Sequence, residues 1–167
     1  LYIDHYSRNV LCEANTILDT SISGIHYGNS TGDIIDNVVY DGANNGLSYA
    51  SLISVYGTAT EIGSLTGNIM YALDTKAWTL GTDDMNRIAV SDDNYFFHPF
   101  VEDQICYRRW DRVSFREWQH LSGMDARSKT NWFIRSPGDS PGSAVFYNDS
   151  DSSRRVRPGL ANYLDLD

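Results

Sequence analysis

Two short stretches of the sequence share one spacing: "NTILDTSISGI", from Asn15 to Ile25, and "NVVYDGANNGL", from Asn37 to Leu47. In each, an Asn is followed by a triplet of mostly β-branched or apolar residues and then by an acidic residue. A Gly and a large aliphatic residue come nine and ten positions after the Asn. Such self-similarity decides the fold, because a period of about 20 to 50 residues is typical of solenoids.

The pattern occurs twice more along the chain. Asn68 is followed by Ile-Met-Tyr and later by Ala77 and Trp78, a small residue and then a large apolar one. Asn94 is followed by Tyr-Phe-Phe, but the later pair is missing. The separations between the four asparagines are 22, 31 and 26 residues. Each repeat therefore joins a fixed arc of about ten residues to an arc of variable length.

The arcs predict short β-strands rather than helices. Two positions after each Asn the residue is apolar, and after the small residue the order is large, polar, large, as in Ile25-His26-Tyr27. This two-residue period is that of a strand with one buried face. Helical repeats are excluded because the arcs are short, rich in β-branched and aromatic residues, and interrupted by Gly, Asn and Asp. The expected core positions are Ile17, Val39, Met70 and Phe96.

A coil of such strands places equivalent residues of successive rungs about 4.8 Å apart. At a tight bend Asn tolerates left-handed backbone angles, and its amide can pass hydrogen bonds from rung to rung. We therefore predict a ladder of four asparagines at one bend: Asn15, Asn37, Asn68 and Asn94.

This arrangement resembles the right-handed parallel β-helix of the pectate-lyase-like superfamily, in which an Asn ladder lines one bend and "N-x-I" and "G-I" phrases recur. The resemblance covers roughly residues 1 to 100. It implies an all-β, right-handed parallel β-helix solenoid in a secreted or cell-surface bacterial protein, with a polysaccharide as its partner.

The chain is expected to divide into coils over residues 1–108 and a C-terminal cap over 109–167. Ser114 and Glu117 form a capping box and Gly123 a stop signal, which predicts a helix over 115–121 with Trp118 packed on the solenoid. Residues 143–167 predict strand, turn and strand, and resemble the C-terminal region of secreted bacterial β-helix repeat proteins. Because Leu1 opens already structured sequence, we expect these to be the last coils of a longer solenoid.

Composition limits the partners. The net charge is −9, from 22 acidic and 13 basic residues, which disfavours nucleic acid, anionic lipid surfaces and polyanionic glycans unless Ca²⁺ bridges them. There is no apolar run of about 18 residues to span a membrane. The dense basic stretch with Arg154, Arg155 and Arg157 favours a solvated hairpin over a binding patch. Cys12 and Cys106 form no C-x-x-C pattern, and a disulfide between them is left open.

One surface strip is the candidate for sugar chemistry. The expected outward positions are His26, Ser48 and Thr79, flanked by Ser23, Asn45 and Lys76. A lyase needs a base beside the uronate carboxyl and a cation to neutralise that carboxyl, so His26 and Lys76 are its candidate catalytic residues. Ser48, Thr79 and Asn45 are candidate carbohydrate contacts. The alternative is a solvated polar face without catalytic function.

Acidic residues offer two further possibilities. Asp19 and Asp41 hold the same place in consecutive coils, where two carboxylates could share a Ca²⁺ or could simply cap turns. Asp92 and Asp93 are candidate acid and base of a hydrolase, although adjacent residues on a strand point to opposite faces. The characteristic phrases of polygalacturonases and pectate lyases are missing, so catalytic residues could lie upstream of Leu1.

The sequence thus leads to two hypotheses of different class. The first is the C-terminal part of a secreted β-helix protein that binds and degrades a polysaccharide, as a lyase or a glycoside hydrolase. The second is a non-catalytic extracellular scaffold, adhesin or fibre component that uses the same solenoid for length and self-associates.

Overall fold

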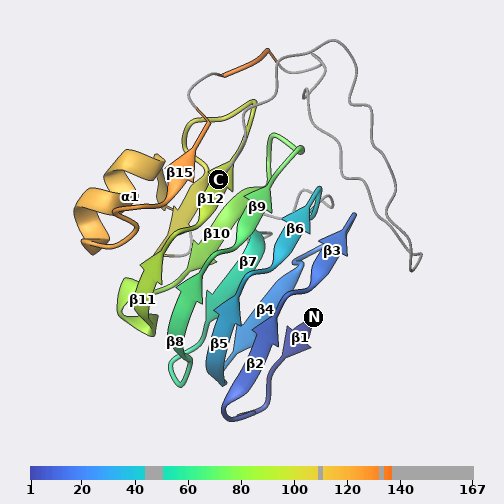
Figure 1. The fold of residues 1–167 in the computed structure, drawn as a ribbon, viewed down its shortest axis with the longest axis vertical. Helices are drawn as coiled ribbons and strands as arrows, with labels where there is room; N and C mark the ends of the chain where they lie inside the picture. Colours follow the sequence, from blue (N-terminus) through green and yellow to red (C-terminus); the bar gives the residue numbers. More distant parts are fainter. Residues whose placement is uncertain (44–50, 109–110, 132–133, 137–167) are drawn as a thin grey trace.

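The chain forms a parallel β-solenoid, as the repeat predicts. The computed structural model describes residues 1–43, 51–108, 111–131 and 134–136. Three sheets run along the stack, and each of four coils contributes one strand to every sheet (Figure 1). The strands predicted within residues 143–167 lie outside the described residues.

The sheets are called A, B and C in the order in which the chain visits them. Sheet A contains β1 (Tyr2–Ile3), β4 (Ile25–Gly28), β7 (Ser51–Tyr56), β10 (Trp78–Thr82), β13 (Ile105–Tyr107) and β14 (Asp111–Val113). Sheet B contains β2 (Val10–Glu13), β5 (Thr31–Ile35), β8 (Glu61–Thr66) and β11 (Ile88–Asp92). Sheet C contains β3 (Thr16–Leu18), β6 (Val38–Tyr40), β9 (Ile69–Tyr71), β12 (Tyr95–Phe97) and β15 (Lys129–Thr130). A short 3₁₀ helix, η1 (Met85–Arg87), precedes β11.

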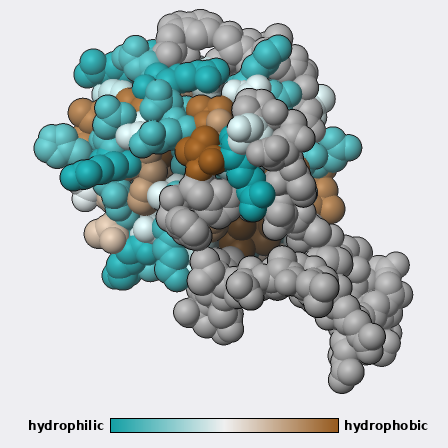
Figure 2. All heavy atoms as spheres, turned by 90° about the horizontal axis from the view of Figure 1, so that it is seen from above, coloured by the Kyte–Doolittle hydropathy of each residue, from teal (hydrophilic) through white to brown (hydrophobic). Residues whose placement is uncertain are grey.

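The core fills the space between the three sheets. Alternate residues of each strand point inward, and all four predicted core positions face this space. Val39, Met70 and Phe96 are fully buried, whereas Ile17 of the first coil is partly exposed. Seen from above, the described surface is mainly hydrophilic, with a smaller group of hydrophobic side chains near its centre (Figure 2).

The bend between sheets B and C has two residues in every coil, which explains the regular Asn spacing. Its second residue is the predicted Asn, but its first residue, not the Asn, has left-handed backbone angles. The first residues are Ala14, Asp36, Gly67 and Asp93. The prediction of left-handed asparagines is therefore wrong. The residue before the Asn makes the turn, which leaves the Asn side chain pointing inward along the stack.

The four asparagines lie in one hydrogen-bonded column. The backbone N–H and Nδ2 of Asn15 donate to Asn37 Oδ1 at 3.0 and 2.9 Å. Asn37 makes the same two bonds to Asn68 Oδ1, both at 3.0 Å. Asn68 makes them to Asn94 Oδ1 at 2.9 and 3.1 Å. In each of these six bonds the donor lies one coil before its acceptor.

The predicted register of sheet A is wrong. Ile25 aligns with Ile53 and Leu80, not with Leu47 and Trp78. The reason is that no segment outside the bend between sheets B and C has a fixed length. Ten residues lie between sheets C and A before β7 but six before β4 and β10, and β10 itself starts two residues before the row of Ile25.

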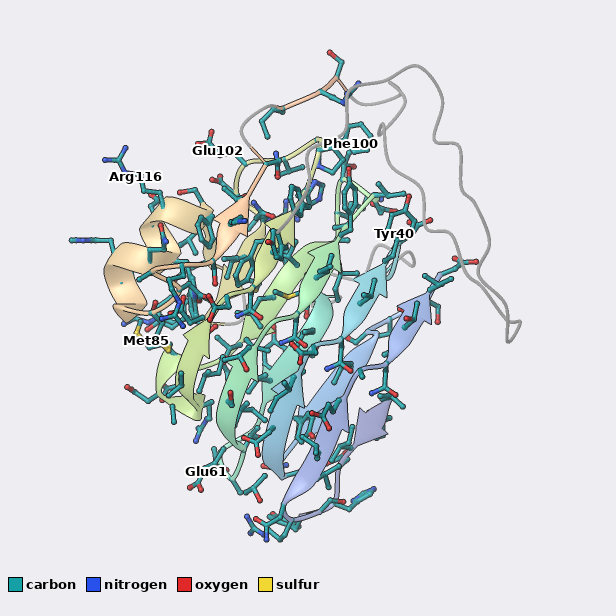
Figure 3. The ribbon with its side chains drawn as sticks, in the orientation of Figure 1. Tyr40, Glu61, Met85, Phe100, Glu102 and Arg116 are labelled. Carbon is teal, nitrogen blue, oxygen red and sulfur yellow. The ribbon has the colours of Figure 1, made fainter. Side chains whose placement is uncertain are left out.

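The last coil is covered by the predicted helix, α1 (Phe115–Ser122), which lies beyond β11 and β15 (Figure 1). Ser114 and Glu117 form the expected capping box, and Gly123 ends the helix with φ 70°. Trp118 is fully buried. Arg116, on the opposite face of the helix, points away from the sheets (Figure 3). The helix thus closes the hydrophobic end of the solenoid.

The buried carboxylate of Asp125 joins this cap to the ladder. Its Oδ1 accepts from Asn94 Nδ2 at 3.2 Å and from Ser128 Oγ at 2.6 Å. Its Oδ2 accepts from Trp118 Nε1 at 2.7 Å. The backbone N–H of Asn94 donates to Ser128 Oγ at 2.8 Å, so the column ends on cap residues.

The two cysteines do not form a disulfide. Both are free and buried. Cys12 lies in β2 of the first coil, whereas Cys106 lies in β13, beyond the fourth. The possibility left open by the sequence is therefore excluded by their positions at opposite ends of the stack.

Candidate functional site: the outer face of sheet A

Sheet A presents one outward column across all six of its strands. The register of neighbouring strands aligns one residue from each, and we call this set the outer column: Tyr2, His26, Ser54, Gly81, Cys106 and Arg112. Neighbouring strands are about 4.8 Å apart, so the column is about 24 Å long. Ser54, Gly81 and Cys106 in its middle are buried, so only Tyr2, His26 and Arg112 reach solvent.

The N-terminal end of the column combines an exposed aromatic ring with two titratable groups. The ring of Tyr2 stacks on that of His26 with 4.9 Å between centroids and 6° between planes. Tyr2 is 73% exposed, and its hydroxyl donates to Asp4 Oδ2 at 2.8 Å. The backbone N–H of His5 donates to Asp4 Oδ1 at 2.7 Å. We call Tyr2, Asp4 and His26 the first-coil cluster.

The environment sets the charges of this cluster. The hydrogen bond from the His5 N–H, followed by that from the Tyr2 hydroxyl, lowers the pKa of Asp4. Partial burial lowers the pKa of His26, and the nearby Asp4 carboxylate opposes this effect. At neutral pH Asp4 is therefore an anion and His26 is neutral. The imidazole can donate one hydrogen bond and accept another.

The loop that carries Asp4 has an unusual backbone. His5, Tyr6 and Asn9 all have left-handed angles, with φ of 57°, 63° and 53°. Such angles are uncommon for residues other than Gly, and they concentrate at functional sites. The loop also leaves the Tyr6 side chain 63% exposed. A second aromatic ring is thus accessible in the loop that carries the first-coil cluster.

Small polar side chains occupy the middle of the column. Ser54 Oγ lies 2.8 Å from Ser23 Oγ and 2.6 Å from Ser51 Oγ. A Cβ at Gly81 would lie 2.6 Å from both Ser51 Oγ and the Tyr56 hydroxyl oxygen. A larger residue at Gly81 would therefore displace its neighbours in this buried part of the column.

The C-terminal end of the column carries a cation. The guanidinium carbon of Arg112 lies 5.3 Å from the centre of the Trp78 ring. The adjacent thiol of Cys106 is buried, and burial raises its pKa to about 11. This thiol is protonated at neutral pH and is unsuited to act as a nucleophile.

The predicted strip is only partly assembled. His26 faces outward in the column, but Thr79 is fully buried and its Oγ1 donates to the Gln104 carbonyl at 3.0 Å. The prediction of Thr79 as an outward sugar contact is therefore wrong. The two-residue register error leaves Thr79 on the same face as Gly81, so the prediction fails because this part of the face is buried. Ser48 and Asn45 lie outside the described residues.

Lys76 does not join His26. It is exposed in the turn before β10, where its backbone N–H donates to Asp74 Oδ1 at 2.8 Å. Strand β7 separates β4, which carries His26, from β10. The predicted pairing of base and cation is therefore not formed by these two residues.

Asp92 and Asp93 connect the fourth coil to the cap. Asp93 accepts two hydrogen bonds from the Arg127 guanidinium, at 2.8 and 2.6 Å. Asp92 Oδ1 accepts the Arg127 backbone N–H at 2.7 Å. Both carboxylates lie at the bend between sheets B and C, away from the outer column. Their proposed role as acid and base has no second observation in its favour.

Asp19 and Asp41 do lie side by side, at the ends of the paired strands β3 and β6. Both have left-handed angles, with φ of 50° and 52°, which suits turn residues. Ca²⁺ takes six to eight oxygen ligands, and two carboxylates fall short of that set. Among the described residues there is no group of three or more His, Cys, Asp and Glu that could hold a metal. We therefore route no chemistry through a metal here.

Sequence reasoning missed three residues of the outer column and its surroundings. Tyr2 and Asp4 precede the first Asn, so no repeat marks them. Arg112 belongs to "YRRWDRVSFR", a basic stretch as dense as the one noted near the C-terminus. The local cluster of arginines could have located Arg112, but the net charge of −9 draws attention away from it.

These features define a class of protein: a helix-capped parallel β-solenoid with a polar and aromatic column on one flank. Comparisons with protein-family models, with curated proteins and with solved structures find no match for this chain. No helix in the described part of the chain is long and apolar enough to cross a membrane.

Proposed function

We propose that this chain is part of a secreted β-solenoid protein of the pectate-lyase-like type, which binds a polysaccharide at the first-coil cluster of sheet A. The observation that supports this most is the first-coil cluster. An exposed aromatic ring offers a face for a sugar ring, and the carboxylate and imidazole beside it can bind sugar hydroxyls.

The charges of the cluster favour a neutral sugar at this point. The ionised Asp4 would repel a uronate carboxylate, and Lys76 is not beside His26 to neutralise one. A neutral glycan also agrees with the overall charge of −9. Binding therefore relies on stacking and hydrogen bonds rather than on ion pairs.

Binding to a panel of neutral and acidic polysaccharides tests the proposal. Removing the ring in Tyr2→Ala should weaken binding of the neutral ligand about three- to tenfold, the range expected for one aromatic contact. Leu11→Ala is the matched control, because Leu11 is 54% exposed on sheet B. Equal affinities for the parent chain, Tyr2→Ala and Leu11→Ala would contradict the proposed site.

Cleavage of the bound glycan is the narrower part of the proposal, with neutral His26 as the candidate base. The assay follows new reducing ends together with the ultraviolet absorbance of unsaturated uronates. Reducing ends alone indicate a hydrolase. Reducing ends with absorbance indicate a lyase, which requires a uronate and would contradict the neutral ligand. Either activity should disappear in His26→Ala, whereas binding should be weakened but not lost, because Tyr2 and Asp4 remain. Binding without either signal would limit the function to recognition.

A non-catalytic scaffold is the second candidate. The predicted catalytic residues are far apart in the fold, which favours this candidate. His26 lies on a strand of sheet A, Lys76 in the turn before β10, and Asp92 at the bend between sheets B and C. This function predicts ordered self-association. Filaments in negative-stain micrographs would support it, and a strictly monomeric sedimentation profile would count against the fibre version.

A further inference from the structure

Gly28 forms the floor of the first-coil cluster. It ends β4, and as an alternate residue of that strand it faces outward like His26. Continuing the register of β1 on β4 by one residue places Asp4 beside Gly28. Gly28 is buried, whereas the side chains of Asp4 and His26 above it are partly exposed.

The backbone does not require a glycine at position 28. Gly57, Gly67 and Gly123 have φ of 105°, 68° and 70°, in the left-handed region that favours Gly, but the φ of Gly28 lies outside that region. Backbone conformation is therefore not what excludes a side chain here. A strand glycine of this kind often marks a place where a ligand approaches the backbone closely.

The space above Gly28 is what a side chain would occupy. A Cβ at this position would lie 2.9 Å from Asp4 Oδ1 and 3.0 Å from His26 Nε2. In a close-packed protein, a Cβ does not approach other heavy atoms this closely unless one of them moves. An alanine would therefore push the carboxylate or the imidazole aside. We call the space between these two groups the Gly28 notch.

Gly63 of sheet B offers a comparison within the same molecule. A Cβ there would lie 2.6 Å from Asp33 Oδ1, and its next neighbours, Asp33 Cγ and the Gly32 carbonyl oxygen, would be 3.7 and 4.0 Å away. Among the described residues, only the Asp33 carboxylate comes close to this position. The Gly28 notch differs because a carboxylate and an imidazole face it together.

Both groups of the notch are held in place by other contacts. Asp4 Oδ2 accepts the Tyr2 hydroxyl at 2.8 Å, and Asp4 Oδ1 accepts the His5 N–H at 2.7 Å. The His26 ring stacks on the Tyr2 ring. A carboxylate oxygen has two lone pairs, so Asp4 Oδ1 can accept a second hydrogen bond. Groups that are already positioned lose little freedom when a ligand binds.

One oxygen atom of a ligand can bridge the two groups. Hydrogen bonds of about 2.9 Å to each polar atom allow this when the atoms are less than about 6 Å apart. Asp4 Oδ1 and His26 Nε2 meet this condition, because both lie within 3.0 Å of one point. A sugar hydroxyl has one hydrogen, which it donates to the carboxylate, and its oxygen accepts from the His26 Nε2–H. Nδ1 then remains the basic nitrogen of the imidazole.

We propose that the Gly28 notch recognises one free hydroxyl of a neutral sugar, which bridges Asp4 Oδ1 and His26 Nε2. This inference rests on the proposed function and names the group that its site recognises. A methyl ether at the same position has no hydrogen for the carboxylate and brings extra volume into the notch. A deoxy position leaves both protein groups without a partner. The site should therefore discriminate against sugars that are O-methylated or deoxygenated at this hydroxyl.

Isothermal titration calorimetry with neutral oligosaccharides tests the notch. The probes are hexasaccharides of glucose, mannose, galactose and xylose, titrated into the parent chain and its variants. Gly28→Ala fills the notch and should weaken binding of the best-bound hexasaccharide about tenfold or more. Gly63→Ala is the matched control, because its Cβ also presses on an Asp carboxylate but lies on sheet B. It should change the affinity less than twofold.

A deoxy series of the best-bound hexasaccharide provides a second test on the unmodified chain. Each form lacks the hydroxyl at one ring position in every unit. The parent chain should lose about tenfold in affinity for one of these forms, and Gly28→Ala should bind that form and the full hexasaccharide equally. Far-UV circular dichroism verifies that each variant keeps its fold.

The outcomes separate the notch from the proposed function. Unchanged affinity in Gly28→Ala, together with weaker binding in Tyr2→Ala, would overturn the notch and leave sugar binding by the cluster intact. Equal affinity of the parent chain for all deoxy forms would also overturn the notch. If the parent chain bound none of the four hexasaccharides, the proposed function would be contradicted and this inference with it.

Discussion

Replacing Asn68 by Ala removes the centre of the asparagine column. Asn68 is fully buried. Its Oδ1 accepts from Asn37 N–H and Nδ2, both at 3.0 Å. Its Nδ2 lies 2.9 Å from the Ile34 carbonyl, 3.0 Å from the Thr66 carbonyl and 3.1 Å from Asn94 Oδ1. Since Nδ2 has only two hydrogens, the side chain contributes about four effective hydrogen bonds.

These bonds set the expected cost. A buried neutral hydrogen bond contributes about 1 kcal/mol net, so Asn68→Ala should lower the free energy of unfolding by about 4 kcal/mol. Asn15→Ala is the matched control at the end of the same column. The Asn15 side chain is partly exposed and donates to Asn37 Oδ1 at 2.9 Å and to the Glu13 carbonyl at 3.1 Å. Its loss should cost about 1 kcal/mol.

Urea unfolding followed by circular dichroism measures both costs. The comparison is valid only if the slope of the unfolding free energy against urea concentration is the same in all variants. A changed slope would indicate that the coils no longer unfold together. Equal destabilisation by the two substitutions would refute the reasoning, since burial and the number of bonds would then not determine the contribution of each Asn. A cost below about 1.5 kcal/mol for Asn68→Ala would refute it as well.

Three further predictions concern the cap and the cysteines. Asp125→Asn places an N–H donor against the Trp118 Nε1–H in one orientation. In the other orientation it faces the three donors on Oδ1, which are Ser91 Oγ, Asn94 Nδ2 and Ser128 Oγ. The substitution should cost about 2 kcal/mol in urea unfolding, and an unchanged midpoint would contradict this. Arg127 lowers the pKa of Asp93, so this ion pair stabilises the fold above the unfolded pKa of about 3.9 and its contribution is lost as pH falls through the lower folded pKa. The difference in melting temperature between the parent chain and Arg127→Ala should therefore shrink from pH 6 to pH 3, and a constant difference would argue against the pair. Because the Cys106 thiol is buried, with a pKa of about 11, a thiol reagent at pH 8 should modify it only after unfolding, and rapid labelling of the native chain would disprove this burial.

The parts of the fold that the sequence predicts correctly are those fixed by local geometry. The bend between sheets B and C always has two residues, so the Asn spacing and the core positions after it follow directly from the sequence. Helix α1 is predicted because Ser114, Glu117 and Gly123 act on their own neighbours. Their positions do not depend on contacts with residues that are distant in the sequence.

The register of sheet A depends on lengths that no local rule sets. Ten residues precede β7 but only six precede β4, so Ile53, not Leu47, continues the row of Ile25. Thr79 keeps the face that was predicted for it, but the sequence does not show that this part of the face is buried. The first-coil cluster was missed for another reason: Tyr2 and Asp4 gain their meaning only from contact with His26, one coil later.

The asparagine column also has electrical consequences. Its side-chain amides all point the same way, so their dipoles add along the stack as peptide dipoles add along a helix. The donor end of the column carries partial positive charge. It ends on the Asp125 carboxylate, whose negative charge complements it. The opposite end is the Asn15 oxygen, which carries partial negative charge at the first coil. A coil stacked before this one would therefore be held by presenting an N–H donor, not a carbonyl oxygen, to the Asn15 oxygen.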